Sequence, residues 1–349
     1  MNITIKLPLR GGRRSIFPLM GVRESLLFLA LLLASCNGQT GKSLRPIADT
    51  IALSPCPRFS ADSTMLYINE QCAFGPRVTG SDASQRCGDY LVERFKALGA
   101  EVEEQTATVT IWDGTKLPAR NIIARINPAN PDRILLCAHW DCRPWADNDE
   151  DEANHHTPIL AANDAASGVA VMLEICRLLQ KKPVPVGIDL ICFDAEDLGT
   201  PQWEEDRLGS SDTWCLGSRF WAEKAKADGY KARYGILLDM VGGRGATFSR
   251  EGISMQTAQP IVNRIWQLAG QIGYRQFFPL NDGGYITDDH VNVNEIAGIP
   301  CIDIIPYYRE GPSSFGPTWH TIQDTPDNID PNVLEAVGQT ITQLIYNEQ

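Results

Sequence analysis

The chain has 349 residues and a formal net charge of −12 at neutral pH. That length allows one large domain or two ordinary ones, and it is sufficient to bury a sizeable hydrophobic core. The acidic charge argues against nucleic-acid binding, because phosphate backbones are bound by basic surfaces. The sequence also contains no fixed-period repeat and no low-complexity tract.

The first 36 residues have the composition of an export signal. Four arginines precede an apolar run over residues 26–33, which is too short to span a bilayer because a spanning helix needs about 20 residues. The run ends in Leu33-Ala-Ser-Cys36, which resembles the lipobox of bacterial lipoproteins, where the cysteine is lipidated and becomes the first residue. We therefore expect an exported protein whose lipid on Cys36 holds it at the periplasmic face of a bacterial membrane. A plain secretory signal is the alternative, and Met20 is an alternative start.

Residues 37–53 show little periodicity and are predicted to be a tether, so the folded domain is predicted to cover residues 54–349. No CxxC pair occurs among the ten cysteines, which argues against a zinc-finger framework. Four cysteines lie inside apolar runs and are predicted to be core residues: Cys137, Cys176, Cys192 and Cys301. Five others could include a disulfide in an oxidising compartment: Cys56, Cys72, Cys87, Cys142 and Cys215.

The first part of the domain predicts a helix followed by three strands. Apolar residues over 87–98 have helical spacing, and residues 102–111, 121–126 and 134–138 read as strands. The first two strands are separated by a glycine-containing loop and are predicted to form a hairpin. The third strand runs directly into His139.

The remaining elements alternate between helices and strands. A helix begins after Asn163-Asp164, and the branched apolar run over 186–193 predicts a buried strand, so these two form a β-α-β unit with the preceding strand. The later elements are a helix at 220–227, a strand at 234–240, a helix at 261–272, a strand at 299–305 and a helix behind Asp330-Pro331. This alternation predicts an α/β fold in a single domain, with a central twisted mixed sheet flanked by helices.

Acidic and histidine side chains gather where the predicted strands end. In chain order they are His139, Asp141, Asp164, Asp194, Glu196, Asp197, Asp239 and His320. Ligands of open α/β sheets bind at the carboxyl ends of strands, and buried carboxylates there need a metal or a charged partner. The mixture of nitrogen and oxygen donors favours zinc, which keeps one coordination position open in catalytic sites.

Glu196 and Asp197 are adjacent on an extended segment, so their side chains point in opposite directions and can have different roles. The simplest interpretation is that one of them binds the metal and the other transfers a proton. Asp194, at the start of the same acidic segment, is expected to support them.

Taken singly, each candidate also has an ordinary alternative. Asp164 could cap a helix, His139 could be a satisfied core histidine, and Asp239 could bond to a turn. His155 and His156 lie in an acidic segment and are predicted to be solvated loop residues. The complete ordered set is more specific than any of its members.

That ordered set resembles the zinc aminopeptidase fold family with co-catalytic metals. Asn163-Asp-Ala-Ala-Ser-Gly168 matches the family's bridging-aspartate loop, and His320-Thr-Ile-Gln-Asp-Thr325 matches its final ligand loop. The resemblance covers nearly all of the chain after the signal and implies the same fold. One departure is that the family usually has two glutamates where this chain has Glu196-Asp197. The aspartate is one methylene shorter, so the backbone or the metal must shift to compensate.

A narrower resemblance is to the glutaminyl-peptide cyclotransferases (glutaminyl cyclases) of Bacteroidetes, which share that fold. It is carried by Trp319 directly before His320, Phe315 five residues before His320, the triplet Asp288-Asp-His290, Leu216-Gly-Ser-Arg219 after the acidic pair, and the run His139-Trp-Asp-Cys-Arg-Pro-Trp145. It implies an acyltransferase that converts the N-terminal glutamine of peptides and secreted proteins to pyroglutamate and releases ammonia.

The resemblance also implies a role for each site residue. The implied zinc ligands, with one ion per chain, are Asp164, Asp197 and His320. The implied catalytic residues are Glu196, which carries the proton, Asp288, which holds the leaving amide, and Asp239, which supports the proton path. The implied substrate contacts are the aromatic residues Phe315, Trp319, Trp203 and Trp214, with core packing as the alternative for the last two. His139 and Asp141 are left for a second metal or for support of the first.

Two other functions stay open at this point. A dinuclear aminopeptidase would use the same residues, with a second metal on His139 and Asp239 bridged by Asp164, and with Glu196 deprotonating water. A non-catalytic binding lipoprotein would be expected to have lost Glu196 or a ligand, and none is missing.

Overall fold

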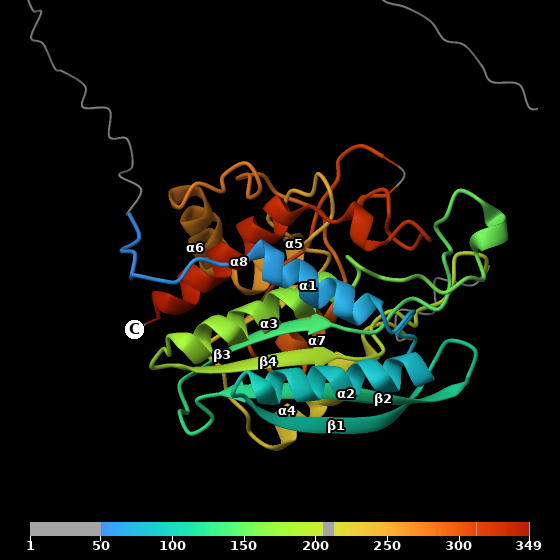
Figure 1. Cartoon of the computed structure of the whole chain (residues 1–349), viewed down its shortest axis with the longest axis horizontal. Helices are drawn as coiled ribbons and strands as arrows, with labels where there is room; N and C mark the ends of the chain where they lie inside the picture. Colours follow the sequence, from blue (N-terminus) through green and yellow to red (C-terminus); the bar gives the residue numbers. More distant parts are fainter. Residues whose placement is uncertain (1–49, 205–212, 312, 349) are drawn as a thin grey trace, which may run out of the picture. The chain divides into compact units, whose positions relative to one another are not determined.

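A six-stranded sheet with helices on both faces forms the body of the structure (Figure 1). The computed structural model describes residues 50–204, 213–311 and 313–348. The predicted signal peptide, Cys36 and most of the predicted tether lie outside these residues. In sheet order the strands are β1 (Glu101–Thr110), β2 (Lys116–Ile126), β4 (Gly187–Phe193), β3 (Arg133–His139), β5 (Gly235–Leu238) and β6 (Cys301–Ile304).

The sheet is mixed, as predicted. β1 and β2 form the predicted antiparallel hairpin, and β2 also pairs in antiparallel fashion with β4. The strands β4, β3, β5 and β6 run parallel to one another. Helix α3 (Ala166–Lys181) connects β3 to β4, which confirms the predicted β-α-β unit. Since parallel strands end at the same edge of a sheet, the segments that follow these four strands meet there.

The helices divide between the two faces of the sheet. With α3, one face carries α1 (Ala61–Cys72), α2 (Asp82–Ala97), α6 (Gln259–Gln271) and α8 (Pro331–Tyr346). The other face carries α4 (Leu216–Ala227) and α7 (Asp289–Glu295), and the short α5 (Gly252–Thr257) lies beside β6. No helix within the described ranges is long and apolar enough to cross a bilayer.

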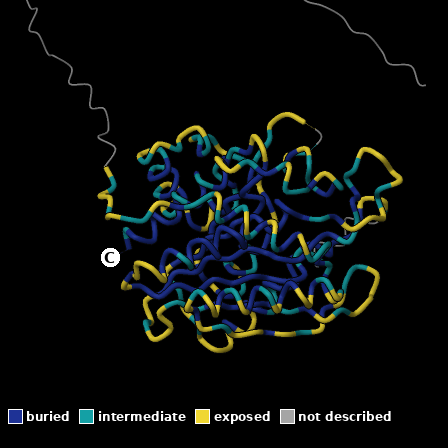
Figure 2. Tube along the Cα trace, viewed as in Figure 1, coloured by how far each residue is buried: buried dark blue, intermediate teal, exposed yellow. Residues whose placement is uncertain are grey.

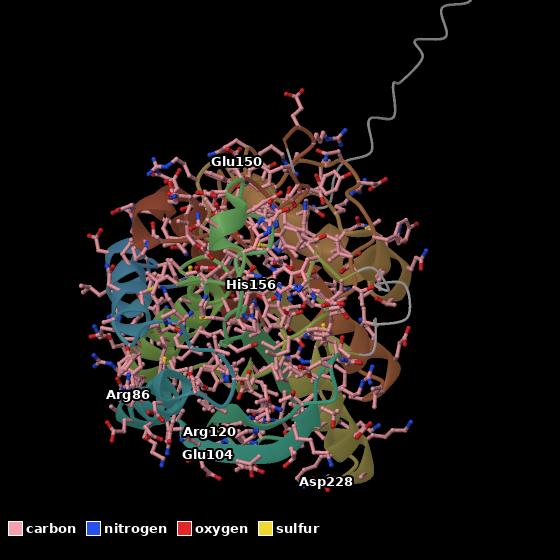
Figure 3. All side chains as sticks on the ribbon, turned by 90° about the vertical axis from the view of Figure 1, so that its right-hand side faces the viewer. Arg86, Glu104, Arg120, Glu150, His156 and Asp228 are labelled. Atoms are coloured by element: carbon pink, nitrogen blue, oxygen red, sulfur yellow. The ribbon has the colours of Figure 1, made fainter. Side chains whose placement is uncertain are left out.

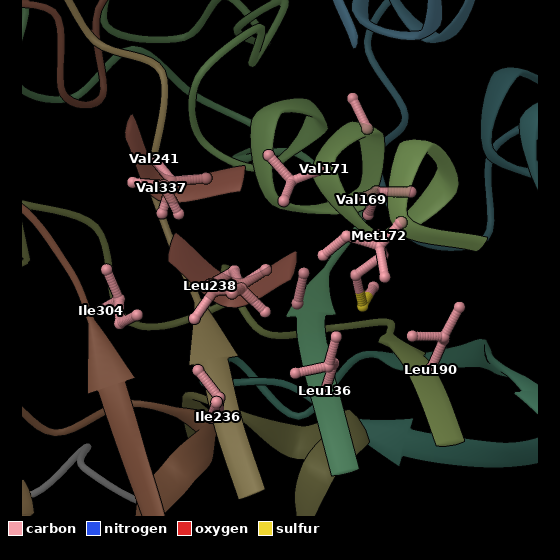
Figure 4. Packing of buried hydrophobic residues seen from close by; sticks show 14 of the residues in the cluster. Leu136, Val169, Val171, Met172, Leu190, Ile236, Leu238, Val241, Ile304 and Val337 are labelled. Atoms are coloured by element: carbon pink, nitrogen blue, oxygen red, sulfur yellow. The ribbon is translucent and has the colours of Figure 1, made fainter. Parts of the chain in front are cut away.

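Successive side chains along each strand point to opposite faces of the sheet, and both faces are buried under helices. Leu136, Leu190 and Ile236 point toward α3 and belong to the larger hydrophobic cluster (Figure 4). Their neighbours Leu135 and Ile191 point to the opposite face, where they pack in the cluster that includes α4 and α7. β3 and β4 are buried along their whole length, as the dark central strands of Figure 2 show. Burial on both faces is the reason these strands read as nearly continuous apolar runs.

Gly168, in the first turn of α3, determines how closely this helix approaches β5. A Cβ atom at this position would lie 2.1 Å from the carbonyl oxygen of Leu238, so a larger residue cannot be accommodated without a shift of the backbone. The close packing brings Asp164, just before α3, beside Asp239, just after β5. Both carboxylates reach Nε2 of His139, at 2.9 and 3.2 Å.

Three helices of the described structure, α1, α5 and α7, were not predicted from the sequence. Helix α1 buries the polar residues Thr64 and Gln71 together with Ile68, so its apolar periodicity is weak. Helices α5 and α7 have only 6 and 7 residues, too few to display a helical period. Helix α4 begins at Leu216, earlier than predicted, and α8 begins at Pro331 as predicted.

All nine cysteines in the described part of the chain are free thiols, so the disulfide considered from the sequence is absent there. Eight of the nine are buried, including the four predicted to lie in the core, and only Cys56 is partly exposed. The thiols therefore act mainly as small apolar residues.

Candidate metal centre and active site

Three side chains from three different loops form the strongest candidate for a metal site. Asp164, Asp197 and His320 each place one ligand atom so that all three atoms lie within 4.8 Å of one another. Nε2 of His320 lies 3.1 Å from Oδ1 of Asp197 and 3.7 Å from Oδ2 of Asp164. All three residues are buried, and they are the three ligands predicted from the sequence.

The bonding of Asp197 indicates that a cation belongs here. Both of its carboxylate oxygens are buried and neither accepts a hydrogen bond, while Oδ1 lies within ion-pair distance of His320 and, at 3.6 Å, of Arg143. A buried carboxylate that accepts no hydrogen bond is costly unless cations compensate its charge. Two carboxylates and one imidazole are a donor set that zinc accepts in catalytic sites, with room for a further ligand. The residues present therefore fit a zinc ion.

The acidic loop after β4 separates the directions of Glu196 and Asp197. Ala195 has a left-handed backbone with φ of 57°, and the carboxylate of Asp141 accepts the backbone N–H groups of Glu196 and Asp197 at 3.1 and 3.2 Å. The side chain of Asp197 then faces His320, whereas Oε1 of Glu196 accepts the thiol S–H of Cys215 at 3.3 Å. The two adjacent acids thus have different surroundings, as their spacing predicts.

Asp141 and Asp194 support this loop from behind. Both oxygens of Asp141 are engaged by loop N–H groups, and Asp141 belongs to none of the metal-sized clusters among the described residues. Asp194 accepts hydrogen bonds from the Thr79 hydroxyl at 2.7 Å and from the backbone N–H of Arg120 at 2.8 Å. Of the two roles considered for Asp141, the geometry favours support over metal binding.

A second cluster adjoins the first and shares one residue with it. His139, Asp164 and Asp239 also place ligand atoms within 4.8 Å of one another, and all three are buried. Asp164 lies between His139 and His320, in the position expected of a ligand that bridges two metals. His139, Asp164 and Asp239 therefore have the spacing needed to hold a second metal ion.

Two acids of the site outside the first cluster, Glu196 and Asp288, have raised carboxyl pKa values. Burial raises the pKa of Glu196 well above its ordinary value, and nearby Asp197 and Asp288 raise it further against the opposing effect of His139. Burial, reinforced by the charge of Asp239, raises the pKa of Asp288 to about 7. Raised carboxyl pKa values of this kind are typical of groups that donate or accept protons near neutral pH.

A cavity of about 460 Å³ opens onto these groups. Its polar side contains Asp164, Glu196, Asp197, Asp239, Asp288 and His320, and its apolar side contains Met240, Ile286, Ile305, Trp214, Phe315 and Trp319. The rings of Phe315 and Trp319 lie 4.8 Å apart. Three of the four predicted aromatic contacts therefore line the cavity.

Trp203 is the exception to the predicted aromatic lining. It is 38% exposed, is not among the cavity residues, and packs against Trp145 at 5.8 Å and His156 at 4.5 Å. His156, labelled in Figure 3, is exposed as predicted and makes this ring contact. Trp214 instead packs against Gly199, where a Cβ would lie 1.7 Å from the indole ring. Because Gly199 has no side chain, the indole ring of Trp214 fits beside the acidic loop.

Arg143 and Asp147 are important site residues that the sequence interpretation missed. Arg143 is 1% exposed and pairs with Asp147 through two hydrogen bonds of 3.0 and 2.6 Å. Its guanidinium also donates to the backbone carbonyl of Asp197 at 3.1 Å and lies 4.6 Å from the ring centre of Trp214. Asp147 in turn contacts Nδ1 of His320 at 3.3 Å. The available signal was an arginine and an aspartate four residues apart just after His139.

Comparison with known proteins identifies relatives of this chain. The solved glutaminyl cyclase of Bacteroides thetaiotaomicron is 50% identical with a TM-score of 0.82, covering 84% of this chain and 100% of that one. A Zn-dependent exopeptidase structure from Parabacteroides distasonis is 48% identical with the same TM-score and the same coverage. Aminopeptidase YwaD of Bacillus subtilis is 28% identical over 82% of this chain, which spans only 57% of that longer protein. Residues 121–345 match the model of peptidase family M28, and the chain belongs to that family.

Proposed function

We propose that this protein is a glutaminyl cyclase, which converts an N-terminal glutamine to pyroglutamate and releases ammonia. The observation that carries the proposal is the composition of the cavity. Its polar side combines the zinc ligand set with Glu196 and Asp288, and its apolar side presents Phe315 and Trp319. Similarity to the Bacteroides thetaiotaomicron glutaminyl cyclase over the full length of that structure supports the same function.

Asp164, Asp197 and His320 would hold the zinc ion. When bound, zinc supplies Lewis acidity, which polarises the γ-carbonyl group of the substrate glutamine. The substrate's own α-amine attacks that carbonyl carbon, and the five-membered ring already supplies the proximity of the reacting atoms. A C–N bond forms, and the C–N bond to the amide nitrogen breaks.

Glu196 is the group that moves the proton. It lies on the cavity surface beside the predicted ligands, and its carboxylate can accept a proton from the attacking amine and return it to the leaving nitrogen, which departs as ammonia. The elevated pKa of Glu196 suits both halves of this transfer. No water enters the reaction, so the proton carried by Glu196 comes from the substrate and returns to the product.

Asp288 and the aromatic side chains orient the substrate. Oδ2 of Asp288 is buried without a partner and is available to accept an N–H of the leaving amide. Asp239, whose pKa burial raises to about 6, lies next to His139 and Asp164 and supports the proton path. The rings of Phe315, Trp319 and Trp214 exclude competing water from the flat amide group.

A dinuclear aminopeptidase is the second candidate, because His139, Asp164 and Asp239 retain a second ligand cluster. In that enzyme Glu196 would deprotonate a water molecule, and peptide-bond hydrolysis would replace cyclisation. A non-catalytic binding lipoprotein is the least supported reading, since the ligands and Glu196 are all retained.

One assay separates these functions. Purified zinc-loaded protein is incubated with a glutamine-initiated peptide and, separately, with leucyl p-nitroanilide, while ammonia and nitroaniline are measured. Ammonia release with formation of the pyroglutamyl peptide is expected, and nitroaniline without ammonia would refute the cyclase. Glu196→Gln should abolish turnover while zinc stays bound, and retained turnover would disprove its role as proton carrier.

We also propose that the mature protein is lipid-anchored at the periplasmic face of a bacterial membrane and acts there on exported peptides and proteins. The support is the Leu33-Ala-Ser-Cys36 sequence after a short apolar run. Labelling with a radioactive fatty acid should mark the wild-type protein and not Cys36→Ser. Labelling of Cys36→Ser to the same extent would rule the anchor out.

A further inference from the structure

A third group of side chains with the chemistry of metal ligands lies beside the predicted zinc site. Glu196, Cys215 and Asp288 each place one ligand atom within 4.8 Å of the other two. Sγ of Cys215 lies 3.3 Å from Oε1 of Glu196. Cys215 precedes α4 in a left-handed conformation, with φ of 54°, and the residue is only 3% exposed. This cluster contains the only sulfur among the three metal-sized groups found in the described part of the chain.

Asp288 gives an independent indication that a ligand fits here. Asp288 is only 4% exposed. Its Oδ2 is buried without any hydrogen-bond partner, while its Oδ1 accepts the N–H of Asp289 at the start of α7. An unpaired buried carboxylate oxygen beside a thiol is a favourable environment for a cation. Glu196 and Asp288 both line the cavity, so an ion can reach the cluster from solvent.

We propose that Cys215, Glu196 and Asp288 form a second cation site, separate from Asp164, Asp197 and His320, that binds a thiophilic divalent ion such as Zn²⁺ or Cd²⁺. One thiolate and two carboxylates are ligands that both ions accept. Binding forms a metal–sulfur bond and releases the thiol proton to solvent, with no change of oxidation state.

The affinity of this site is expected to be weaker than that of the predicted zinc site. Burial raises the pKa of the Cys215 thiol well above its ordinary value, and the neighbouring carboxylates raise it further, so the thiol must lose its proton at a cost. The consequence for activity rests on the proposed function. An ion held by Glu196 would block its role as proton carrier, so excess metal should inhibit the enzyme.

Cadmium is the probe, because a bond between sulfur and cadmium produces an ultraviolet charge-transfer band. Zinc-loaded protein is titrated with Cd²⁺, and the band, the bound cadmium and any released zinc are measured together. The expected result is a band that saturates at one cadmium per chain while zinc stays bound. Cys215→Ser should remove the band and weaken cadmium binding by about 100-fold, since even outer partners of metal ligands are worth about 10–100-fold.

Cys56→Ser is the matched control, because Cys56 is the one partly exposed cysteine among the described residues and lies outside the cluster. It should keep the band and the affinity of the unmodified protein. If Cys215→Ser does not fold, Asp288→Asn provides the second test, with cadmium affinity expected to fall by about 10–100-fold and the band retained at saturation. A band of equal strength in Cys215→Ser, no band in the unmodified protein, or zinc release equal to cadmium uptake would each overturn the proposal.

Activity is a separate arm of the experiment. Cadmium should inhibit ammonia release in the unmodified protein over the same concentration range in which the band develops, and Cys215→Ser should require about 100-fold more cadmium for the same fractional inhibition. A saturating band in a protein that does not cyclise glutamine peptides would support the cation site and refute the cyclase function. Cyclase activity without a band would support the cyclase function and refute the cation site.

Discussion

Oδ1 of Asp147 lies 3.3 Å from Nδ1 of His320, opposite the ring nitrogen that faces Asp197. This ion-pair contact leaves Nε2 facing the predicted metal position. Asp147 is itself fixed by the two hydrogen bonds from Arg143. The orientation of one ligand therefore depends on a buried pair that does not touch the metal.

Asp147→Asn should weaken zinc binding by about 10–100-fold, because the uncharged amide no longer supports the basicity and orientation of His320. Competition with a chromogenic chelator measures the affinity directly. Glu150→Gln, an exposed acid in the same loop (Figure 3), should leave it unchanged. Equal affinities for the two variants would show that the contact with His320 has no role in metal binding.

Arg143→Met should lower the free energy of unfolding by about 3–5 kcal/mol, because the buried carboxylate of Asp147 loses its two hydrogen bonds from the guanidinium. The same substitution removes the donors to the carbonyl groups of Asp197 and Gly199. Urea unfolding of the zinc-free protein measures the loss. Arg86→Met, at an exposed position on α2, should change stability by no more than about 0.5 kcal/mol. A loss for Arg143→Met as small as for this control would contradict the interpretation.

Glu251 should make stability depend on pH in the acid range. Burial opposes its ionisation, but His290 and two hydrogen bonds from Ser254 prevail and lower its pKa from 4.5 to about 2. A lowered folded-state pKa means that the unfolded chain binds more protons, so this stabilisation is complete above pH 4.5 and is lost as the pH falls toward 2. The shift corresponds to about 3 kcal/mol.

Urea unfolding of the zinc-free protein between pH 7 and about pH 2.5 tests this dependence. The difference in unfolding free energy between the unmodified protein and Glu251→Gln should shrink as the pH falls. Acids common to both proteins cancel in that difference. A difference that stays constant over this range would show that Glu251 does not ionise with a lowered pKa.

Trp214 and Trp203 should differ sharply in their effect on turnover. Trp214 lines the cavity, whereas Trp203 packs outside it against Trp145. Trp214→Ala should lower kcat/KM for a glutamine-initiated peptide about tenfold, equivalent to about 1.4 kcal/mol of transition-state stabilisation. Trp203→Ala should lower it by less than about twofold. Similar losses in both variants would mean that Trp203 reaches the substrate.

Much of the fold could be predicted from the sequence because its strands are buried on both faces. The continuous apolar run of β4 and the acids directly after it identified a strand end, and parallel strands place such ends together. A set of candidate ligands could therefore be named before any coordinates. The choice of Asp164, Asp197 and His320 from that set depended on the resemblance to the glutaminyl cyclases.

The supporting contacts could not be predicted, because they depend on how loops cross one another. The pairing of Arg143 with backbone carbonyls of the acidic loop joins segments far apart in the chain, and no local pattern encodes it. The direction of Trp203 is likewise set by contacts with Trp145 and His156 and not by its own sequence context. Helix α1 escaped prediction because its buried side includes Gln71, whose amide donates to the backbone carbonyl of Ala166.

The three predicted ligands come from the beginning of α3, the end of β4 and the loop before α8. No single hairpin or helix pair contains the full set, and His320 lies far beyond the other two ligands in the sequence. A nascent or truncated protein that lacks the segment around His320 would bind the ion poorly, even if its sheet had formed. Tight zinc binding can therefore indicate whether a given molecule has completed its fold. It can be used to distinguish intact protein from fragments.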